Sequence, residues 1–306
     1  MIVEVHFLGT GGVMPTRRRM PVCIVVRIKG WCILLECPEN CQLYFTQDGI
    51  GINKPLVILI SHLHADHILG LPGLLLSMSI LGRERVVTVA GPKGLSEFLE
   101  NMFNIMRTGT EYELRIKELV EKEETVLDSD EYIIRAVLVR HTLPSYAFFI
   151  ECKELRGEFD VEKALKLGVP KGPLWRALKM GRTVILPSGK TIKPENVIKG
   201  LRKGIKIAYS SDTRPSAELI EHSRGADMLI HESTHLLYNY NLAFEGGHST
   251  AFHAAEVASA AEVSKLVLVH LSPRYQNNIE EFKKEASQIF KGEILIPEEG
   301  HIVVLR

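Results

Sequence analysis

The chain has 306 residues, 45% of them hydrophobic and 24% charged, as expected for a globular protein that buries a substantial core. Lys and Arg number 37 and so do Asp and Glu, so the chain is not coated with basic charge, although a local basic patch would still hold a polyanion. We expect no signal peptide and no membrane span, because no segment has the required apolar run, and the five scattered Cys residues fit reduced thiols in a cytoplasm.

Hydrophobic patterning predicts strands and helices that alternate over most of the chain. In chain order we predict strands at residues 2–8, 23–28, 32–36, 56–60, 86–90, 133–139, 146–151, 205–209, 228–231, 265–270, 293–296 and 302–305, and helices at 70–82, 93–103, 250–261 and 278–290. The predicted strands at 23–28 and 32–36 would form a hairpin. This order predicts two mixed sheets that face each other, with helices outside.

A cluster of candidate metal ligands directly follows the apolar strand 56–60. His62, His64, Asp66 and His67 lie within six residues, and imidazole nitrogen and carboxylate oxygen suit zinc and similar first-row metals. A strand that ends in a polar loop delivers its side chains to the rim of a sheet, where sites are commonly built. The alternative is a surface loop that is rich in His by chance, and the strand context disfavours it.

Three further candidates follow other predicted strands, namely His141, Asp212 and His270. Each is weak evidence by itself, because a single His at a strand end is more often an ordinary hydrogen-bonded residue. With the cluster they make seven ligands. These fill two metal sites if one carboxylate bridges and a water completes the coordination.

The His-x-His-x-Asp-His motif after a buried strand resembles the metallo-β-lactamase superfamily, and further motifs resemble its ribonuclease Z (tRNase Z) family. They are Phe7-Leu8-Gly9-Thr10-Gly11, His62 to His67, His141, Ser210-Ser211-Asp212-Thr213-Arg214-Pro215, His231-Glu232-Ser233-Thr234, Gly247-His248-Ser249-Thr250 and His270-Leu271-Ser272-Pro273-Arg274-Tyr275. The resemblance implies an α/β fold, the αβ/βα four-layer sandwich of the superfamily, with a protruding basic arm.

The same resemblance implies two Zn2+ per subunit, with Mn2+ or Fe2+ as alternatives. The implied ligands are His62, His64 and His141 for one ion, Asp66, His67 and His270 for the other, and Asp212 as the bridge. The implied protein is a cytoplasmic homodimer. Its implied reaction is zinc-dependent cleavage of the 3′ trailer from precursor tRNA after the discriminator nucleotide, which leaves a tRNA 3′-hydroxyl and a trailer 5′-phosphate.

Three residues are the candidate catalytic groups. Asp66 would orient the attacking hydroxide and accept its proton. His248 would protonate the leaving oxygen, while Glu232 would hold the tautomer of His248 and raise its pKa. The alternative for Glu232 and His248 is a supporting role that orients a metal ligand. His231 fits either role and is not assigned.

Two basic regions favour RNA as the substrate. Arg17, Arg18 and Arg19 lie in an early loop and would contact phosphates, although a solvated charge run is about equally compatible. Residues 163–206 carry twelve Lys and Arg but one acidic residue, whereas residues 97–131 carry eleven acidic residues and four basic ones. We therefore predict one domain, 1–306, with an inserted tRNA-binding arm region at 153–204.

Lys171 lies in this arm region and Arg274 follows the last predicted ligand, and both are predicted substrate contacts. The Gly- and Pro-rich stretch from Gly168 to Trp175 resembles part of the family's arm. We expect no regular structure there, with Leu174 and Trp175 exposed.

Two departures from the family pattern, at Met20 and at residues 36–42, bear on substrate fit rather than on the predicted ligands. The main rival is a small-molecule hydrolase of the same fold, acting on a phosphodiester, an aryl sulfate or a thioester, which would not need the basic arm. A non-catalytic RNA-binding protein is a second rival, but binding alone would not require aligned metal ligands.

Overall fold

The protein divides into two compact units in its computed structural model, which describes residues 2–43, 51–153 and 155–306. We call Met1–Glu151 with Ile205–Arg306 the body, and Cys152–Gly204 the small unit. Among the helices of the described residues, none combines the length and the apolar character that a bilayer crossing requires.

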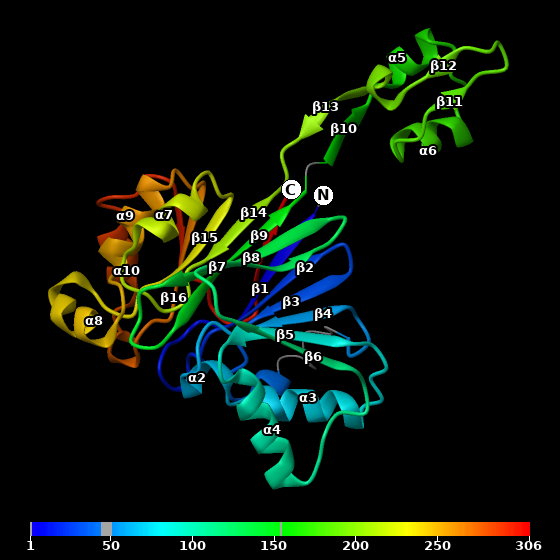
Figure 1. The fold of residues 1–306 in the computed structure, drawn as a ribbon. Helices are drawn as coiled ribbons and strands as arrows, with labels where there is room; N and C mark the ends of the chain where they lie inside the picture. The colour runs from blue at the N-terminus through cyan, green and yellow to red at the C-terminus, as the bar shows by residue number, and fades with distance from the viewer. Residues whose placement is uncertain (1, 44–50, 154) are drawn as a thin grey trace. The chain divides into compact units, whose positions relative to one another are not determined.

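The first sheet of the body has the strand order β18-β1-β2-β3-β4-β5-β6. Its strands are β1 (Val3–Gly9), β2 (Cys23–Ile28), β3 (Trp31–Leu35), β4 (Leu56–Leu59), β5 (Val87–Pro92), β6 (Leu114–Leu119) and β18 (His301–Leu305). The neighbouring helices are α2 (Ala65–Ile68), α3 (Leu71–Ile80) and α4 (Leu95–Met106), which lie on one side of this sheet (Figure 1). Strands β3 to β6 run parallel, so their carboxyl ends meet at one edge.

The second sheet has the order β17-β16-β15-β14-β9-β8-β7. Its strands are β7 (Glu123–Asp128), β8 (Tyr132–Val139), β9 (Ser145–Cys152), β14 (Lys206–Tyr209), β15 (Met228–Glu232), β16 (Lys265–Val269) and β17 (Glu293–Leu295). The helices of this half are α7 (Ala217–Ser223), α8 (Tyr240–Gly246), α9 (Ala251–Ala260) and α10 (Ile279–Ala286), with short 3-10 turns at Leu237–Asn239 and Pro273–Tyr275. Figure 1 shows α7, α9 and α10 on the outer side of the sheet.

The two sheets pack against each other because their strands are apolar on both faces. In β2, Val25 packs in one buried cluster with Leu75 of α3, whereas the neighbouring Ile24 is also fully buried and points to the opposite face. There the sheets meet, and the rings of Trp31 and Tyr132 lie 5.8 Å apart, edge to face. The predicted α/β four-layer arrangement is confirmed.

The strands β6 and β7 and the helices α7 and α8 of the body were not predicted. Both strands are outer strands of their sheets and lie in the acidic stretch 97–131. Their sequences, LRIKEL and EETVLD, are rich in charge and mostly only half-buried or exposed. Edge strands commonly carry charged side chains, so they lack the apolar run on which the prediction depended.

The small unit has its own secondary structure. It consists of β10 (Leu155–Phe159), α5 (Val161–Lys166), α6 (Pro173–Lys179), β11 (Val184–Ile185), β12 (Thr191–Ile192), a 3-10 turn at Pro194–Asn196 and β13 (Ile198–Arg202). Strand β10 pairs with β13 and β11 with β12, both antiparallel. Its hydrophobic core cluster contains the buried residues Ala164, Val169, Leu178, Val184, Leu186, Ile192 and Val197.

The expectation of irregular chain with exposed apolar residues at Gly168 to Trp175 was wrong. Pro173 begins α6, because its fixed φ suits the first helical position, where no N–H is needed. Leu174 and Trp175 pack against the small core, and the Trp175 indole Nε1 donates to the Val169 carbonyl at 2.9 Å. Proline and glycine therefore delimit a helix here instead of preventing one.

Candidate metal centre

The predicted ligands converge from the ends of strands in both sheets of the body. His62 and His64 follow β4, Asp66 and His67 lie in α2, His141 follows β8, Asp212 follows β14, and His270 follows β16. Three residues at these strand ends have left-handed backbone, namely Glu36 (φ 63°), Ser211 (φ 57°) and His270 (φ 58°). Such conformations are unfavourable for residues other than glycine and persist where the surroundings hold them.

The seven residues form two three-residue groups and one shared carboxylate. The first group is His62, His64 and His141, and the second is Asp66, His67 and His270. Within the first, His64 Nδ1 lies 2.9 Å from His62 Nε2 and 3.2 Å from His141 Nε2. Within the second, Asp66 Oδ2 lies 3.6 Å from His67 Nε2 and 3.4 Å from His270 Nε2.

One oxygen of Asp212 lies between the two groups. Asp212 Oδ2 is 3.8 Å from His62 Nε2, 3.4 Å from His67 Nε2 and 3.3 Å from His270 Nε2. Its other oxygen, Oδ1, is buried and has no hydrogen-bond partner. This placement suits a carboxylate that bridges two cations.

The residues fit a pair of divalent cations. Four donors around zinc at 2.0–2.1 Å stand about 3.3 Å apart in a tetrahedron, close to the spacings above. Within the described residues, the Nε2 atoms of His67 and His270 are buried without a hydrogen-bond partner, a costly state unless a cation accepts their lone pairs. Burial also lowers the pKa of His62 well below its usual value, which favours the neutral, metal-binding form.

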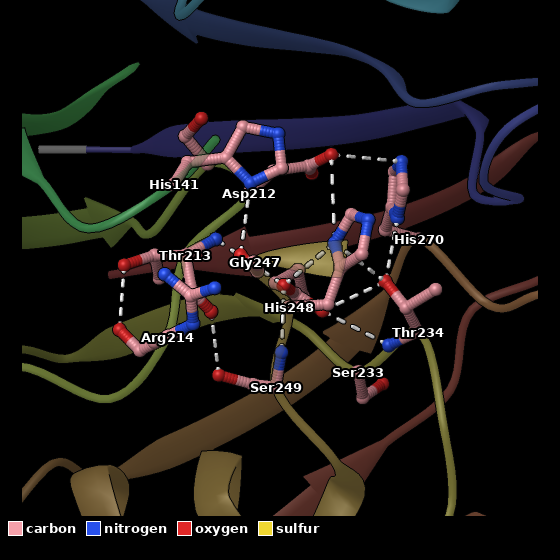
Figure 2. Close-up of polar contacts among 12 residues, drawn as sticks. His141, Asp212, Thr213, Arg214, Ser233, Thr234, Gly247, His248, Ser249 and His270 are labelled. Carbon is pink, nitrogen blue, oxygen red and sulfur yellow. Dashed lines mark hydrogen bonds and ion pairs between the residues drawn. The ribbon is translucent and has the colours of Figure 1, made fainter. Parts of the chain in front are cut away.

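The other ring nitrogen of most ligating histidines contacts a fixed partner. His62 Nδ1 lies 2.9 Å from Ser61 Oγ, His141 Nδ1 lies 2.8 Å from the Gly247 carbonyl, and His270 Nδ1 lies 2.8 Å from Thr234 Oγ1. These partners hold the rings so that Nε2 faces the site. Figure 2 shows the contacts to Gly247 and Thr234.

Glu36 is the corresponding partner of His67, and sequence analysis missed this role. The Glu36 carboxylate is fully buried, with Oε2 3.4 Å from His67 Nδ1 and accepting from the Ser61 N–H at 3.2 Å. In the sequence it stands out only as a departure from the family pattern. The signal that would have revealed it is an acidic residue at the end of a buried strand beside the strand that carries the ligands.

The fully buried Glu232 and the partly buried His248 form a pair next to Asp212. Glu232 Oε1 lies 3.1 Å from His248 Nδ1 and also accepts from the Ser249 N–H at 2.8 Å, so the carboxylate is firmly held. His248 Nδ1 is 3.8 Å from Asp212 Oδ2 (Figure 2). Burial opposes a charge on His248, but the Glu232 carboxylate outweighs it and raises the pKa of His248 to about 9.

Two further residues named in the sequence analysis, Asp66 and His231, have defined contacts. Asp66 Oδ2 accepts a 2.8 Å hydrogen bond from the Val13 N–H, which ties the ligand loop to the early glycine-rich loop. His231 is buried and contacts the Glu232 carbonyl through Nδ1 at 2.6 Å. It belongs to none of the metal-binding groups found among the described residues.

The side chains predicted to contact the substrate differ in their exposure to solvent. Arg17, Lys171 and Arg274 are exposed. Arg18 is exposed as well, and its Nη1 donates to Asn277 Oδ1 at 3.2 Å. Arg19 is half-buried and donates to Thr10 Oγ1 and to the Pro297 carbonyl, so it fixes the loop and is poorly placed to bind a phosphate.

Comparisons with known proteins find relatives over nearly the full length of the chain. The ribonuclease Z of Methanosarcina mazei is 37% identical over 294 residues, covering 96% of this chain and 95% of that protein. The ribonuclease Z of Natronomonas pharaonis is 36% identical over 305 residues, covering 99% and 98%. A family model described as Anti-Pycsar protein Apyc1 matches residues 3–156.

Solved structures share the fold over the whole chain. The short form of human tRNase Z superposes with a TM-score of 0.71 at 23% identity and covers 98% of each chain. The metallo-β-lactamase fold protein YhfI from Bacillus subtilis gives a TM-score of 0.71 at 17% identity and covers 100% of each chain.

The ribonuclease Z relatives, together with the fold and the paired ligand groups, define a hydrolase of the metallo-β-lactamase fold with a candidate metal centre. Its first half matches the Apyc1 model, which spans His62 to His67 and His141 but ends before Asp212 and His270. Over its full length the chain belongs to the ribonuclease Z family. The predicted family membership is confirmed.

Proposed function

We propose that this protein is an endoribonuclease that cleaves the 3′ trailer from precursor tRNA after the discriminator nucleotide. The observation that carries the proposal is the pair of ligand groups joined by Asp212, with the His248–Glu232 pair beside them. Its relatives over the full length are named ribonuclease Z. The products would be a tRNA 3′-hydroxyl and a trailer 5′-phosphate.

The proposed cofactors are two Zn2+ per subunit, with Mn2+ or Fe2+ as alternatives that the same nitrogen and oxygen donors would accept. His62, His64 and His141 would hold one ion, Asp66, His67 and His270 the other, and Asp212 both. When bound, such a pair supplies a Lewis acid for the phosphate and lowers the pKa of water.

The remaining work falls to side chains of the chain itself. Asp66 has a carboxylate that is partly accessible, at 14% side-chain exposure, and is fixed by the Val13 N–H. It would orient the attacking oxygen and accept its proton. His248 would donate a proton to the leaving oxygen, and the Glu232 carboxylate beside it raises its pKa and so favours the protonated form.

The first test of these proposed roles is cleavage of the RNA substrate. Purified protein is incubated with a 3′-extended precursor tRNA, beside an Asp66→Ala variant of measured metal content. A single cut at the discriminator that the variant does not make supports the proposal. A metal-loaded wild type that leaves the precursor intact but hydrolyses a small phosphodiester overturns it in favour of the small-molecule hydrolase.

The small unit is the proposed tRNA-binding element. It carries 13 Lys and Arg against five Asp and Glu, the electrostatic footprint of a site for a phosphate backbone. A clean deletion is available, because Glu151 and Lys206, which flank the unit, pair in adjacent strands. Replacing 153–204 by a short Gly-Ser linker should abolish precursor cleavage and leave small-phosphodiester hydrolysis intact.

We propose that the protein acts as a homodimer in the cytoplasm. The five cysteines are buried thiols, which supports a reducing compartment. Leu43, Ile80 and Leu81 are exposed, Ile80 at 85%, around the end of α3, and exposed apolar patches commonly mark interfaces. An Ile80→Glu variant should sediment as a monomer, whereas an unchanged mass for this variant would place the interface elsewhere.

A further inference from the structure

An exposed aromatic surface lies on α8, the helix that ends two residues before the proposed proton donor His248. Tyr240 and Phe244, in α8, expose 44% and 52% of their surface, unusual for rings of this size. The two rings lie 5.9 Å apart, tilted by 34°. Figure 1 shows α8 (yellow) at the periphery of the body.

A cation completes this surface. The Arg214 guanidinium lies 4.7 Å from the centre of the Phe244 ring, and its Nε donates to the Phe244 carbonyl at 2.8 Å. Because that partner is a neutral carbonyl, it does not cancel the charge of the guanidinium. We call Arg214, Tyr240 and Phe244 the aromatic platform.

Backbone bonds fix the platform to the catalytic residues. The His248 N–H donates to the Ala243 carbonyl at 2.7 Å, and the Gly247 N–H donates to the Phe244 carbonyl at 3.2 Å. The Gly247 carbonyl in turn contacts His141 Nδ1, and Arg214 follows Asp212 by two residues (Figure 2). Phe244 and His248 are four positions apart in the sequence, which is about 14 Å even for a fully extended chain.

From this geometry we infer that the aromatic platform stacks an unpaired base of the RNA next to the bond that is cut. The inference rests on the proposed function and adds to it a contact between the protein and a base near the cleaved bond. Exposed aromatic rings beside an Arg are the chemistry that proteins use to hold single-stranded RNA, since rings stack on bases and the cation attracts phosphate. The bond after the discriminator lies in unpaired RNA, so its neighbouring bases are free to stack.

The main test compares Phe244 variants on a 3′-extended precursor tRNA. Phe244→Ala should raise KM about 5- to 150-fold, the range expected from stacking energies of about 1–3 kcal/mol per base. Phe244→Trp should restore the wild-type KM, whereas Phe244→Leu, which is apolar but cannot stack, should not. Leu242→Ala, on the same helix and 40% exposed, is the matched control and should behave as wild type.

A substrate change identifies the base. Precursors with a single abasic nucleotide at each position around the cut should include one on which wild type and Phe244→Ala have the same KM. Hydrolysis of methyl p-nitrophenyl phosphate and bound metal should be unchanged in Phe244→Ala, because the backbone bonds to His248 and Gly247 do not depend on the ring.

Three results would overturn the inference. The first is an unchanged KM for Phe244→Ala on the precursor, and the second is rescue by leucine as complete as by tryptophan. The third is a loss of activity that accompanies a change in the sedimenting mass, which would make the platform a protein interface. If the wild type cuts no precursor at all, the proposed function has failed instead, and this outcome is distinguishable because it precedes any comparison of variants.

Discussion

The body and the small unit have opposite chemistry. All twelve His residues lie in the body and none in the small unit, and the body carries 24 Lys and Arg against 32 Asp and Glu, where the small unit carries 13 against five. Neutral overall composition therefore hides one unit suited to metals and another suited to phosphates. A site that aligns several side chains needs a large core to hold it, whereas attraction of a polyanion needs only charge on a small scaffold.

The largest expected effect is the loss of the bridge in the body. Asp212→Ala removes the one carboxylate oxygen shared by both ligand groups, so we expect cleavage to fall by at least about a thousandfold and bound metal to drop, since removing groups that act as a unit has large effects. The measurement is single-turnover cleavage together with metal analysis. Asp130→Ala, an exposed residue of the same type, is the control, and full metal content with full activity in Asp212→Ala would refute the bridge.

Next in size is the proton donor. In Glu232→Gln the partner that raises the pKa of His248 to about 9 is lost, so kcat on precursor tRNA should fall about 100-fold or more. The alkaline limb of the rate profile should also move to lower pH, because an acid catalyst is active only below its pKa. A substrate with a p-nitrophenolate leaving group needs no proton and should be much less affected. Equal losses on both substrates would indicate that the pair only supports the metal ligands.

A third change separates the two units directly. Trp175→Ala removes a packed ring and its bond to Val169 from a core with few buried residues, so the small unit should unfold locally. Precursor cleavage should weaken while metal content and small-phosphodiester hydrolysis remain. Hydrogen exchange within 152–204 is the direct measurement, and unchanged protection there would contradict an independent small core.

A fourth, smaller effect concerns single charges of the small unit. Lys171→Ala should raise KM for precursor tRNA a few-fold and reduce the slope of log KM against log salt by about one, since one phosphate contact is lost. Lys93→Ala, an exposed lysine of the body, is the comparison. Equal salt slopes for wild type and Lys171→Ala would remove Lys171 from the interface.

The last expected effect is on stability and concerns acid sensitivity. Burial lowers the pKa of His235 to about 4, against a usual value of 6.5. Below about 6.5 the unfolded chain binds a proton that the folded body excludes, so His235 costs stability as pH falls from 6.5 towards 4, on the order of 1–2 kcal/mol at pH 5. Thermal melts at pH 7 and pH 5 should show a smaller drop for His235→Asn. An identical drop would assign the acid sensitivity to other groups.

The sequence was sufficient to predict the central strands and to single out the residues that form the candidate metal-binding groups. Apolar runs such as Leu56 to Ile60 end in polar residues, and the ends of strands in packed sheets converge. The partners of the ring nitrogens were not predictable, because Glu36, Thr234 and Gly247 approach their histidines only after distant segments pack. The edge strands β6 and β7 and the helix α6 were missed for a related reason. Their charged residues and proline do not give the usual sequence pattern of a strand or helix, and packing in the folded protein stabilises these elements.

The left-handed backbone at Glu36, Ser211 and His270 sets a limit on how this protein can change. Each such residue costs roughly 1–2 kcal/mol relative to glycine, so glycine would relieve the backbone strain, but it would also delete the proposed ligand His270 or the buried Glu36 carboxylate that contacts His67. Selection for heat resistance and selection for catalysis would therefore favour opposite residues at the same positions, a trade-off between durability and activity. Thermostable descendants of this chain should accumulate their changes elsewhere.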